Sequence, residues 1–376
     1  MGGPRVGYES LESVVALKDL HAAIGQQLEV VLEDARTPEE ASQGAMFLLR
    51  VLSMSTEVVA DSNPRAPHWA RMDTPGRKVG GDNPDAEYDS VRLDGRYRYR
   101  ISGNAGSVAH FSMTFNGGGS GRRSTFDYRN ERTMGLDERG DYTLILSATE
   151  PTEAGTWIQT PEGIYSILVR QFIGDRERET LATYDIEVLD PHAEALARQP
   201  YTDDEIAERI RAATSGFQIM TALHRLVYPE LFDDPHRFVS NNSDGFGADI
   251  SGTDNLYMFA TYDLADDEAL VIDLQPLEVS YWNIVVMTRF HETLDYLTRR
   301  MSRTMANVVP EADGTIRLVL THGRDVHPNW LDTAGHRHGV LLLRWVGPRD
   351  AVTDMPTTRV VEVAELVTEP GAVGEA

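Results

Sequence analysis

Histidines gather towards the end of this chain. Of its 11 histidines, five lie between residues 291 and 338: His291, His322, His327, His336 and His338. An imidazole titrates near neutral pH, so it can transfer protons during a reaction, and in its neutral form it can bind a metal ion. The simplest interpretation of any single one is a solvated or structural loop histidine. The cluster makes this segment the first place to look for chemistry.

We favour an acid–base site in this segment. Asp332 precedes His336 by four residues, and a carboxylate beside an imidazole can fix its tautomer and favour its cation. A second carboxylate and a phenol could come from Asp295 and Tyr296. The sequence therefore predicts a pocket whose catalytic residues are His336, Asp332 and Asp295, and whose ligand-binding residues are Trp330, Arg344, Tyr296 and His291.

A metal site is the weaker alternative. His336 and His338 flank one arginine, and together with His322 and His327 they could supply the histidines of a cupin-like site. The glutamate spacing of such sites is missing, and the chain has no cysteine. We therefore predict no bound metal and no cofactor. The sequence also lacks a nucleophile-elbow serine, a phosphate-cradling glycine loop and a zinc-protease helix motif.

The composition limits the partners. A formal charge of -24 repels phosphate backbones and anionic lipid, so nucleic acid and membrane surfaces are poor partners. The lack of cysteine fits a reducing compartment, and we see neither a leader-like start nor an apolar run near the roughly 18 residues of a membrane span. We expect a cytoplasmic protein that binds a small-molecule or carbohydrate-like ligand. A homo-oligomer is compatible with the sequence.

Arginine almost replaces lysine in this chain. Of the 35 basic residues, only Lys18 and Lys78 are lysines. A biased proteome explains this best. The alternative is that arginines at matching points of a repeat grip carboxylate, sulfate or phosphate groups.

An internal duplication organises the chain. Asp82-Asn83 recurs as Asp254-Asn255, Arg132-Thr133-Met134 as Arg303-Thr304-Met305, and Trp157 as Trp330, at offsets between 171 and 173 residues. A repeat of this length is domain-sized, so it predicts two copies of one domain. Function should lie where the copies differ, because the features they share mostly serve the fold.

Hydrophobic periodicity predicts the elements of each copy. Apolar residues recur every three or four positions over residues 8–36 and after two capping boxes, at Thr37 to Glu40 and Thr202 to Glu205. After each box the period becomes two, which predicts antiparallel strands. We predict a mainly β protein with helices (α+β), built from two tandem antiparallel β-sandwich or jelly-roll domains, each preceded by a helix. The expected segments are an N-terminal helical segment (1–36), the first copy (37–190), the second copy with the histidine cluster (191–367) and a disordered tail (368–376).

The region around the second tryptophan resembles a known family. The run Asn329-Trp330-Leu331-Asp332-Thr333-Ala334-Gly335-His336, followed by residues 340–345, resembles the bacterial domain of unknown function 1214, often found with its companion family 1254. Residues 82–85, 156–157 and 166–172 look like the same family's other signature. The resemblance implies a pair of jelly-roll-like sandwiches in a bacterial protein and supplies no reaction.

The spacing between tryptophan and arginine differs between the copies. Arg170 follows Trp157 by 13 residues, whereas Arg344 follows Trp330 by 14. A shift of one residue reverses the face of a strand unless a bulge absorbs it. The sequence therefore leaves the equivalence of Arg170 and Arg344 open.

Taken together, these patterns predict a twin-sandwich protein with an asymmetric pocket in its second copy. We favour metal-free acid–base catalysis, as in a hydrolase, lyase or isomerase acting on a small polar or glycan- or lipid-derived metabolite. A non-catalytic glycan- or metabolite-binding module is the alternative, and a cupin-like metal-dependent enzyme is the second alternative. A deep pocket with converging titratable groups would favour the enzyme, and a shallow aromatic platform the binding module.

Overall fold

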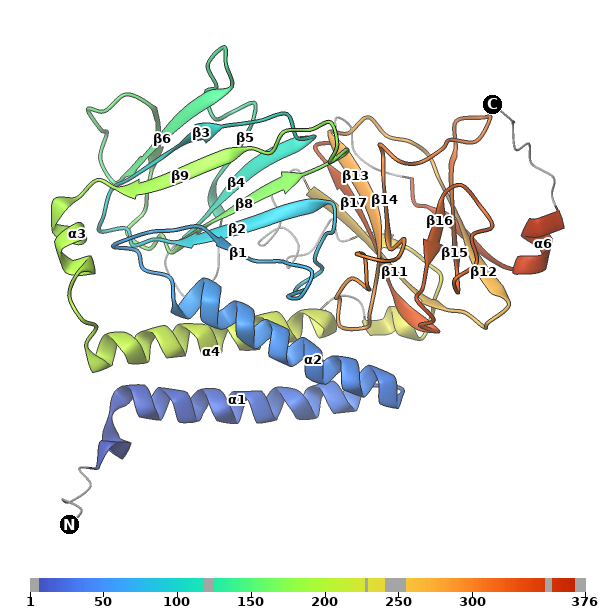
Figure 1. The fold of residues 1–376 in the computed structure, drawn as a ribbon, viewed down its shortest axis with the longest axis horizontal. Coiled ribbons are helices and arrows are strands. Elements are labelled where there is room, and N and C mark those ends of the chain that lie inside the picture. The colour runs from blue at the N-terminus through green and yellow to red at the C-terminus, as the bar shows by residue number, and fades with distance from the viewer. Residues whose placement is uncertain (1–6, 118–124, 227–228, 241–254, 349–353, 369–376) are drawn as a thin grey trace.

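A layer of helices packs against two β-sandwiches (Figure 1). The computed structural model describes residues 7–117, 125–226, 229–240, 255–348 and 354–368. The long helices are α1 (Glu12–Asp34), α2 (Pro38–Met54) and α4 (Asp203–Leu226). The short helical segments are Tyr8–Ser10, Ser55–Ala60, α3 (Pro191–Ala197), Pro229–Phe232 and α6 (Val363–Thr368). Within these described ranges, no helix combines the length and the apolar character that crossing a membrane requires.

Both predicted capping boxes begin helices. The Thr37 hydroxyl accepts a hydrogen bond from the Glu40 amide at 3.2 Å at the start of α2, where Pro38 occupies the first turn. At the start of α4, Thr202 and Glu205 bond each other reciprocally, at 3.2 Å and 2.9 Å. These bonds satisfy amide groups that a helix N-terminus leaves free.

The first sandwich consists of two facing sheets. One has the order β1-β2-β8-β4-β5 and the other β7-β6-β3-β9. All neighbouring strands are antiparallel except β6 and β7, which are parallel. The strands are β1 (Ala70–Arg71), β2 (Ala86–Arg92), β3 (Tyr99–Asn104), β4 (His110–Asn116), β5 (Thr125–Asn130), β6 (Asp141–Ser147), β7 (Thr156–Gln159), β8 (Ser166–Phe172) and β9 (Thr183–Val188).

The second sandwich repeats this topology strand for strand. Its sheets have the orders β10-β11-β17-β13-β14 and β16-β15-β12-β18, again with one parallel pair, β15 and β16. This repetition confirms the predicted fold class of duplicated β-sandwiches with helices. The strands are β10 (Val239–Ser240), β11 (Asn255–Asp263), β12 (Glu268–Leu274), β13 (Tyr281–Met287), β14 (Ser302–Thr304), β15 (Ile316–Thr321), β16 (Trp330–Asp332), β17 (His338–Val346) and β18 (Thr357–Glu362).

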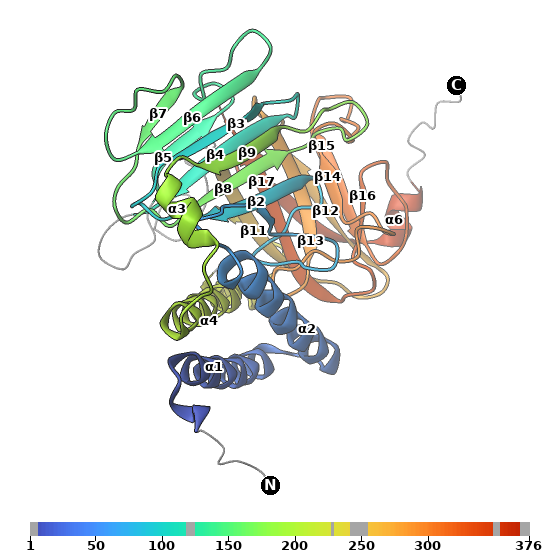
Figure 2. The same cartoon turned by 60° about the vertical axis from the view of Figure 1, so that its left-hand side comes forward.

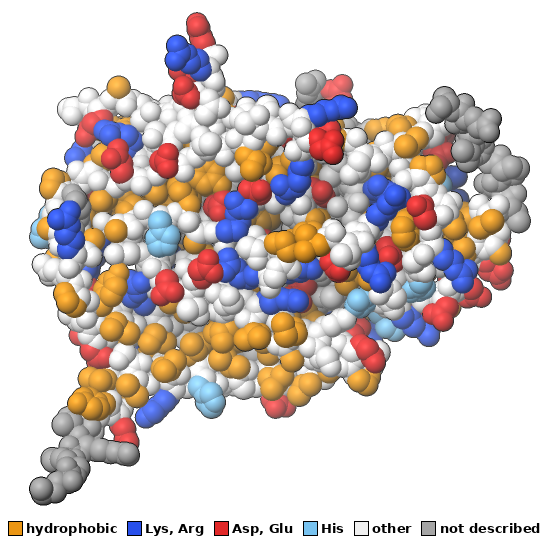
Figure 3. Space-filling view, in the orientation of Figure 1, with side chains coloured by type: hydrophobic (Ala, Val, Ile, Leu, Met, Phe, Trp, Pro, Cys, Tyr) orange, Lys and Arg blue, Asp and Glu red, His pale blue; other side chains and the backbone are white. Residues whose placement is uncertain are grey.

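Each sandwich has its own apolar core, and the helices form a shared layer outside them. Val169 of β8 lies in the first core and Leu343 of β17 in the second. The helical layer buries a separate cluster that joins α1, α2 and α4 to both sandwiches, as the rotated view also indicates (Figure 2). On the outside of this layer, apolar side chains of α1 and α2 remain exposed, among them Leu17 and Leu49 (Figure 3).

The helices do not divide neatly between the two copies. The Asp203 carboxylate at the start of α4 accepts hydrogen bonds from the Glu12 and Ser13 amides at the start of α1, at 2.8 Å and 3.2 Å. The predicted segment boundaries at residues 36, 190 and 367 therefore remain a prediction. Of the predicted tail, residues 369–376 lie outside the described residues.

The sheet registers show that the two tryptophans are equivalent. Trp157 lies in β7 and Trp330 in β16, which are the strands that pair in parallel with β6 and β15. Each indole Nε1–H donates a hydrogen bond to that neighbouring strand, to the Ser147 carbonyl at 3.2 Å and to the Thr321 hydroxyl at 2.7 Å. Each tryptophan thus adds a side-chain hydrogen bond to the same parallel pair of strands, β6 and β7 in the first sandwich and β15 and β16 in the second.

The arginines are equivalent as well. Arg170 lies between Tyr88 and Ser112 on the neighbouring strands, and Arg344 lies between Tyr257 and Asn283. The extra residue after Trp330 therefore falls outside the strand, and both arginines stay on the sheet face opposite the core.

Two other repeat markers do not occupy equivalent positions. Asn83 precedes β2 by three residues, whereas Asn255 begins β11. Met134 is fully buried in the first core, whereas Met305 is 41% exposed. The repeated strand order confirms the duplication. The short sequence identities, however, do not identify which residues of the two copies are equivalent.

Candidate functional site

The predicted site residues lie in several places. His336 and Asp295 line one pocket, which α2 forms with the connection between β13 and β14. Tyr296 faces a different cavity between the two sandwiches. The other predicted residues make structural contacts, which we describe first.

Asp332 and His336 bind different partners. The Asp332 carboxylate pairs with Arg299 at 3.0 Å and accepts hydrogen bonds from the Gly323 and Ala334 amides at 3.0 Å and 2.8 Å. The His336 Nδ1 atom lies 2.9 Å from the Thr333 carbonyl, so this nitrogen carries a proton and donates it. The sequence predicts that Asp332 sets the tautomer of His336. In the structure, the Thr333 carbonyl sets it instead.

Arg344 and His291 join the two sandwiches. Arg344 is 1% exposed, and its Nη2 group donates hydrogen bonds to the carbonyls of Gly81 and Asp82, the second at 3.2 Å. The His291 carbonyl accepts a hydrogen bond from the Gly81 amide at 2.9 Å. Burial lowers the pKa of His291 to about 3, so its ring is neutral at physiological pH. Both residues hold a loop of the first sandwich against the second.

The remaining histidines are dispersed. His322 contacts the Thr333 hydroxyl and the Leu264 carbonyl, His327 pairs with Glu311 at 3.3 Å, and His338 pairs with Asp263 at 3.3 Å. Over the described part of the chain, no three His, Cys, Asp or Glu side chains come together in a way that could hold a metal ion.

The pocket that contains His336 and Asp295 has a volume of about 390 Å³. We call it the helix–loop pocket. Gln43, Met46 and Arg50 of α2 form one wall, and residues 288 and 292–295 of the β13–β14 connection form another. Lys78 comes from the first sandwich and His336 from the β16–β17 connection. Four segments distant in sequence therefore meet here.

Glu292 is the most perturbed titratable group of the helix–loop pocket. Its side chain is 1% exposed, and its Oε2 atom pairs with Arg50 Nη1 at 2.9 Å. Its Oε1 atom is buried and has no hydrogen-bond partner among the described residues. Burial raises the pKa of Glu292 to about 7, although the charge of Arg50 opposes this. Near neutral pH the carboxyl group can therefore both donate and accept a proton.

Lys78 supplies a buried cation beside this carboxyl group. Its Nζ atom donates to the carbonyls of Thr293 and Leu294 at 2.9 Å and 2.6 Å, and it lies 4.9 Å from the centre of the Tyr296 ring. Burial lowers the pKa of the ammonium group. An ammonium group has three N–H donors, and these two carbonyl groups accept two of them.

Arg50 and His336 complete the polar lining. The Nε atom of Arg50 is buried and has no hydrogen-bond partner within the described ranges. His336 Nε2 lies 2.5 Å from Gln43 Nε2, and because its other nitrogen is protonated, it accepts this hydrogen bond. Gln43 and His336 also line a neighbouring cavity of about 440 Å³. Asp295 is exposed at the mouth, where a hydrogen bond from Thr298 lowers its pKa.

Sequence reasoning missed Glu292, Arg50 and Lys78. Neither Glu292 nor Arg50 stands in a recognisable motif. Lys78 carried a signal, because it is one of two lysines in a chain with 35 basic residues. A lysine kept at a buried position where arginine is the rule indicates a need for a compact ammonium group or a group whose pKa can shift.

Two β-sandwiches of identical strand order under a common helical layer define a twin-sandwich protein. Residues 260–350, in the second sandwich, match the family model described as "Protein of unknown function (DUF1214)", which is the family that the motif around Trp330 resembles.

The structure is similar to two solved structures. An uncharacterized protein from Burkholderia cenocepacia is 28% identical, with a TM-score of 0.86 over 94% of this chain and 99% of that one. A protein from Vibrio parahaemolyticus shares the fold, with 12% identity and a TM-score of 0.50 over 84% of this chain and 100% of that one. A comparison with curated proteins finds no match. These similarities support the fold and supply no activity.

Proposed function

We propose that the helix–loop pocket is a catalytic site that performs metal-free acid–base chemistry on a small polar metabolite, with Glu292 as the group that transfers the proton. One observation carries this proposal. Glu292 lines a pocket that also contains two cations; it is a buried carboxyl group with a pKa near 7, and its Oε1 atom has no hydrogen-bond partner among the described residues. Perturbed titratable groups that converge in a pocket are typical of catalytic sites.

The arrangement suits removal of a proton from carbon next to a carbonyl or carboxylate group. Ionised Glu292 would take the proton through Oε1, and the electron pair of the broken C–H bond would move onto the substrate oxygen. The ammonium group of Lys78 and the guanidinium group of Arg50 would stabilise this developing negative charge. In an α-hydroxy carbonyl substrate, the hydroxyl proton would move to the former carbonyl oxygen and the proton on Glu292 to the former carbonyl carbon, which leaves a new carbonyl group and completes an isomerisation. In a substrate with a leaving group on the next carbon, departure of that group with its electron pair as the double bond forms completes an elimination.

The residues predicted from sequence have secondary roles in this proposal. His336 and Asp295 line the pocket and would contact the substrate or position it. We propose a small-molecule partner and a cytoplasmic setting, in keeping with the acidic, cysteine-free composition. The exposed apolar side chains of α1 and α2 are compatible with a homo-oligomer.

A deuterium-exchange experiment tests the proposal across several classes of substrate. The protein is incubated in D₂O with a panel of keto acids, hydroxy acids and sugars, and proton NMR follows loss of C–H signals and appearance of products. We expect exchange or turnover of at least one compound, rising with pH through an apparent pKa near 7. Glu292→Gln should reduce this rate by about a hundredfold or more, because an amide cannot take up the proton.

Glu40→Gln is the matched control. Glu40 is also a buried glutamate paired with an arginine, Arg289 at 3.1 Å, and one of its carboxyl oxygens is likewise buried without a partner in the described residues. It does not line the helix–loop pocket, so its loss should leave turnover unchanged. Binding of panel compounds without exchange or turnover would support the alternative of a non-catalytic binding module. Equal losses in both variants would contradict a catalytic role for Glu292.

A further inference from the structure

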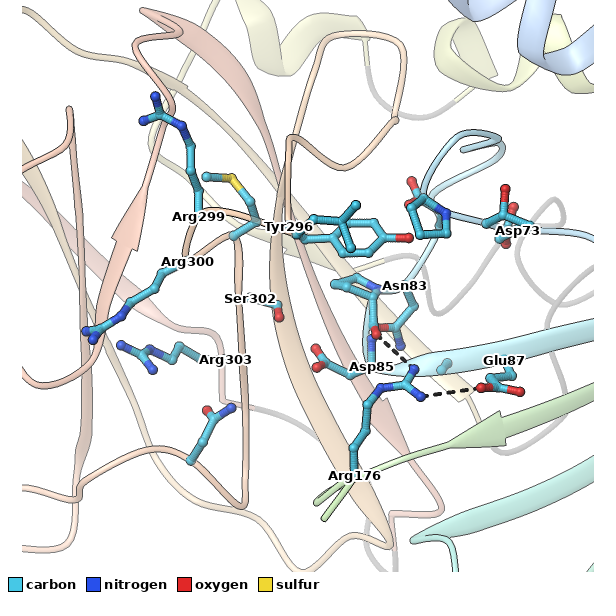
Figure 4. A pocket seen from close by; sticks show the side chains of 18 of the residues that line it. Asp73, Asn83, Asp85, Glu87, Arg176, Tyr296, Arg299, Arg300, Ser302 and Arg303 are labelled. Atoms are coloured by element: carbon cyan, nitrogen blue, oxygen red, sulfur yellow. Dashed lines mark hydrogen bonds and ion pairs between the residues drawn. The ribbon is translucent and has the colours of Figure 1, made fainter. Parts of the chain in front are cut away.

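A larger cavity, of about 590 Å³, opens between the two sandwiches (Figure 4). We call it the interdomain cleft. It shares no lining residue with the helix–loop pocket, so it is a separate candidate site. Its volume lies within the range of roughly 300–1,000 Å³ that is usual for small-molecule sites. Asp73 lies at one end, Arg300 and Arg303 lie at the other, and Tyr296 and Asn83 lie between them.

At the end of the cleft where Asp73 lies, one carboxyl oxygen has no hydrogen-bond partner among the described residues. Both oxygens of Asp82 accept hydrogen bonds from Thr293, one of them at 2.8 Å, and Glu87 pairs with Arg71 and Arg176. By contrast, Asp73 Oδ1 is buried and accepts no hydrogen bond from the described residues. Burial, reinforced by the charge of Asp82, raises the pKa of Asp73 well above its usual range. A bound cation would stabilise the ionised form of this group.

One arginine at the opposite end is hydrogen-bonded to carbonyl groups, and forms no ion pair with a described residue. Arg299 pairs with Asp332 at 3.0 Å and Arg300 with Asp325 at 3.1 Å. Arg303 donates to the carbonyls of Trp330 and Pro328, at 3.1 Å and 3.0 Å, and within the described ranges it forms no ion pair. Burial and the charge of Arg300 lower the pKa of Arg303. Asp325 acts on Arg303 only at a distance and forms its ion pair with Arg300. In a protein with a charge of -24, a half-buried arginine that is hydrogen-bonded to carbonyl groups indicates a place for an anionic group.

We propose that the interdomain cleft binds a zwitterionic molecule, an amino acid or short peptide, with its ammonium group at Asp73 and its carboxylate at Arg303. A simple anion would satisfy only the arginine end, and a simple cation only the aspartate end. A planar guanidinium group can hold a carboxylate through two parallel hydrogen bonds. The Tyr296 ring would lie beside the middle of the ligand. This proposal does not depend on the chemistry proposed for the helix–loop pocket.

Titration calorimetry with defined probes tests the proposal. The probes are glycine, glycylglycine and triglycine, together with the N-acetyl and C-terminal amide derivatives of the peptide that binds most tightly. We expect saturable binding of at least one zwitterion, and binding of each blocked derivative that is about tenfold weaker or more, because each loses one charge-assisted contact. Asp73→Asn should remove the preference over the N-acetyl derivative, and Arg303→Gln the preference over the amide.

Glu292→Gln is the control that separates the two sites, because it should bind the zwitterion like the unmodified protein. Melting temperatures verify that each variant is folded. Arg303 is partly exposed, so Arg303→Gln should fold and can still test the proposal if Asp73→Asn does not fold. Absence of saturable binding for all three zwitterions would overturn the proposal. So would equal affinity for the zwitterion and both blocked derivatives. Neither outcome bears on turnover in the helix–loop pocket.

Discussion

Arg170 and Arg344 occupy the same position in the two sandwiches and make different contacts. Arg170 donates to the hydroxyl of Thr114 within its own sheet, at 2.7 Å. Arg344 reaches out of its sheet to two carbonyl groups of the first sandwich, at Gly81 and Asp82. A residue shared by both copies therefore need not have a shared role. In the second sandwich the same buried arginine helps to hold the two copies together.

A second difference between the copies lies in one connection. Ser112 of β4 pairs with Asn130 of β5, 18 positions later, whereas the equivalent Asn283 of β13 pairs with Thr304 of β14, 21 positions later. The connection between these strands, residues 288–301 in the second sandwich, is therefore three residues longer there. It carries Glu292 and Asp295 to the helix–loop pocket and Tyr296 to the interdomain cleft. If function lies where the copies differ, the β13–β14 connection is the segment to test, because it contributes residues to both cavities.

The largest effect should come from replacing the two arginines. We expect Arg344→Met to lower the free energy of unfolding by about 3–5 kcal/mol, because it leaves the buried carbonyl groups of Gly81 and Asp82 without this donor and removes one of the two cations, with Lys78, that stabilise the buried Asp82 carboxylate. Arg170→Met should cost less, about 1–3 kcal/mol, because a hydroxyl group can turn towards another partner. Urea unfolding of both variants measures the difference. Equal losses would contradict a special role for Arg344 at the interface.

The next effect concerns the pH dependence of Glu292. Its pKa is about 7 in the folded protein against the usual 4.5, so the folded state retains a proton that the unfolded state loses as pH rises. The wild-type protein therefore loses stability between about pH 4.5 and 7, and this cost stays constant above that range. Glu292→Gln removes this cost. Relative to wild type, the variant should gain roughly 3 kcal/mol between pH 5 and pH 8, measured by urea unfolding.

Asp94 of the first sandwich is the control for this pH effect. Burial raises its pKa, but hydrogen bonds from Arg96 and the charge of Arg96 outweigh burial, so its pKa lies below the usual 3.8. Its stabilising contribution is therefore lost only below that pH. Asp94→Asn should show no change relative to wild type between pH 5 and pH 8. A similar gain in both variants would mean that the effect does not come from Glu292.

The smallest effect should come from the tryptophans. Trp157→Phe and Trp330→Phe each remove one indole hydrogen bond to a neighbouring strand, so each should cost about 1–2 kcal/mol of unfolding free energy. Thermal or urea unfolding measures both. Similar values would support a shared structural role. A loss of ligand binding in Trp330→Phe alone would instead restore the ligand-binding role that the sequence predicts for Trp330.

The sequence predicts the fold better than it predicts the repeat alignment. Capping boxes and alternating strands depend on neighbouring residues, so they can be recognised locally. The offset between equivalent residues varies along the chain: it is 169 from Tyr88 to Tyr257, 171 from Ser112 to Asn283 and 174 from Arg170 to Arg344. Connections of different length change the offset, and a fixed spacing therefore pairs Asn83 with the wrong partner.

The candidate site could be predicted only in part. His336 and Asp295 were found from residue type, because histidine and aspartate are common in acid–base chemistry. Their neighbours Lys78 and Arg50 come from the first half of the chain, and contacts across the interface bring them beside Glu292. The pKa of Glu292 depends on burial that only the folded interface creates. This burial cannot be predicted from hydrophobic periodicity or residue spacing, because it depends on contacts between segments that are distant in sequence.

The shared helical layer has a consequence for how such a duplicated gene can change. One apolar cluster contains Val31 of α1, Phe47 of α2, Val79 of the first sandwich, Phe217 of α4 and Phe290 of the second. A fragment that encodes either sandwich alone would expose part of this cluster to water, and about 25 cal/mol of stabilisation would be lost for each Å² of apolar surface uncovered. Loss of either sandwich would therefore destabilise the remaining one. An insertion in a loop of one copy leaves this shared cluster intact.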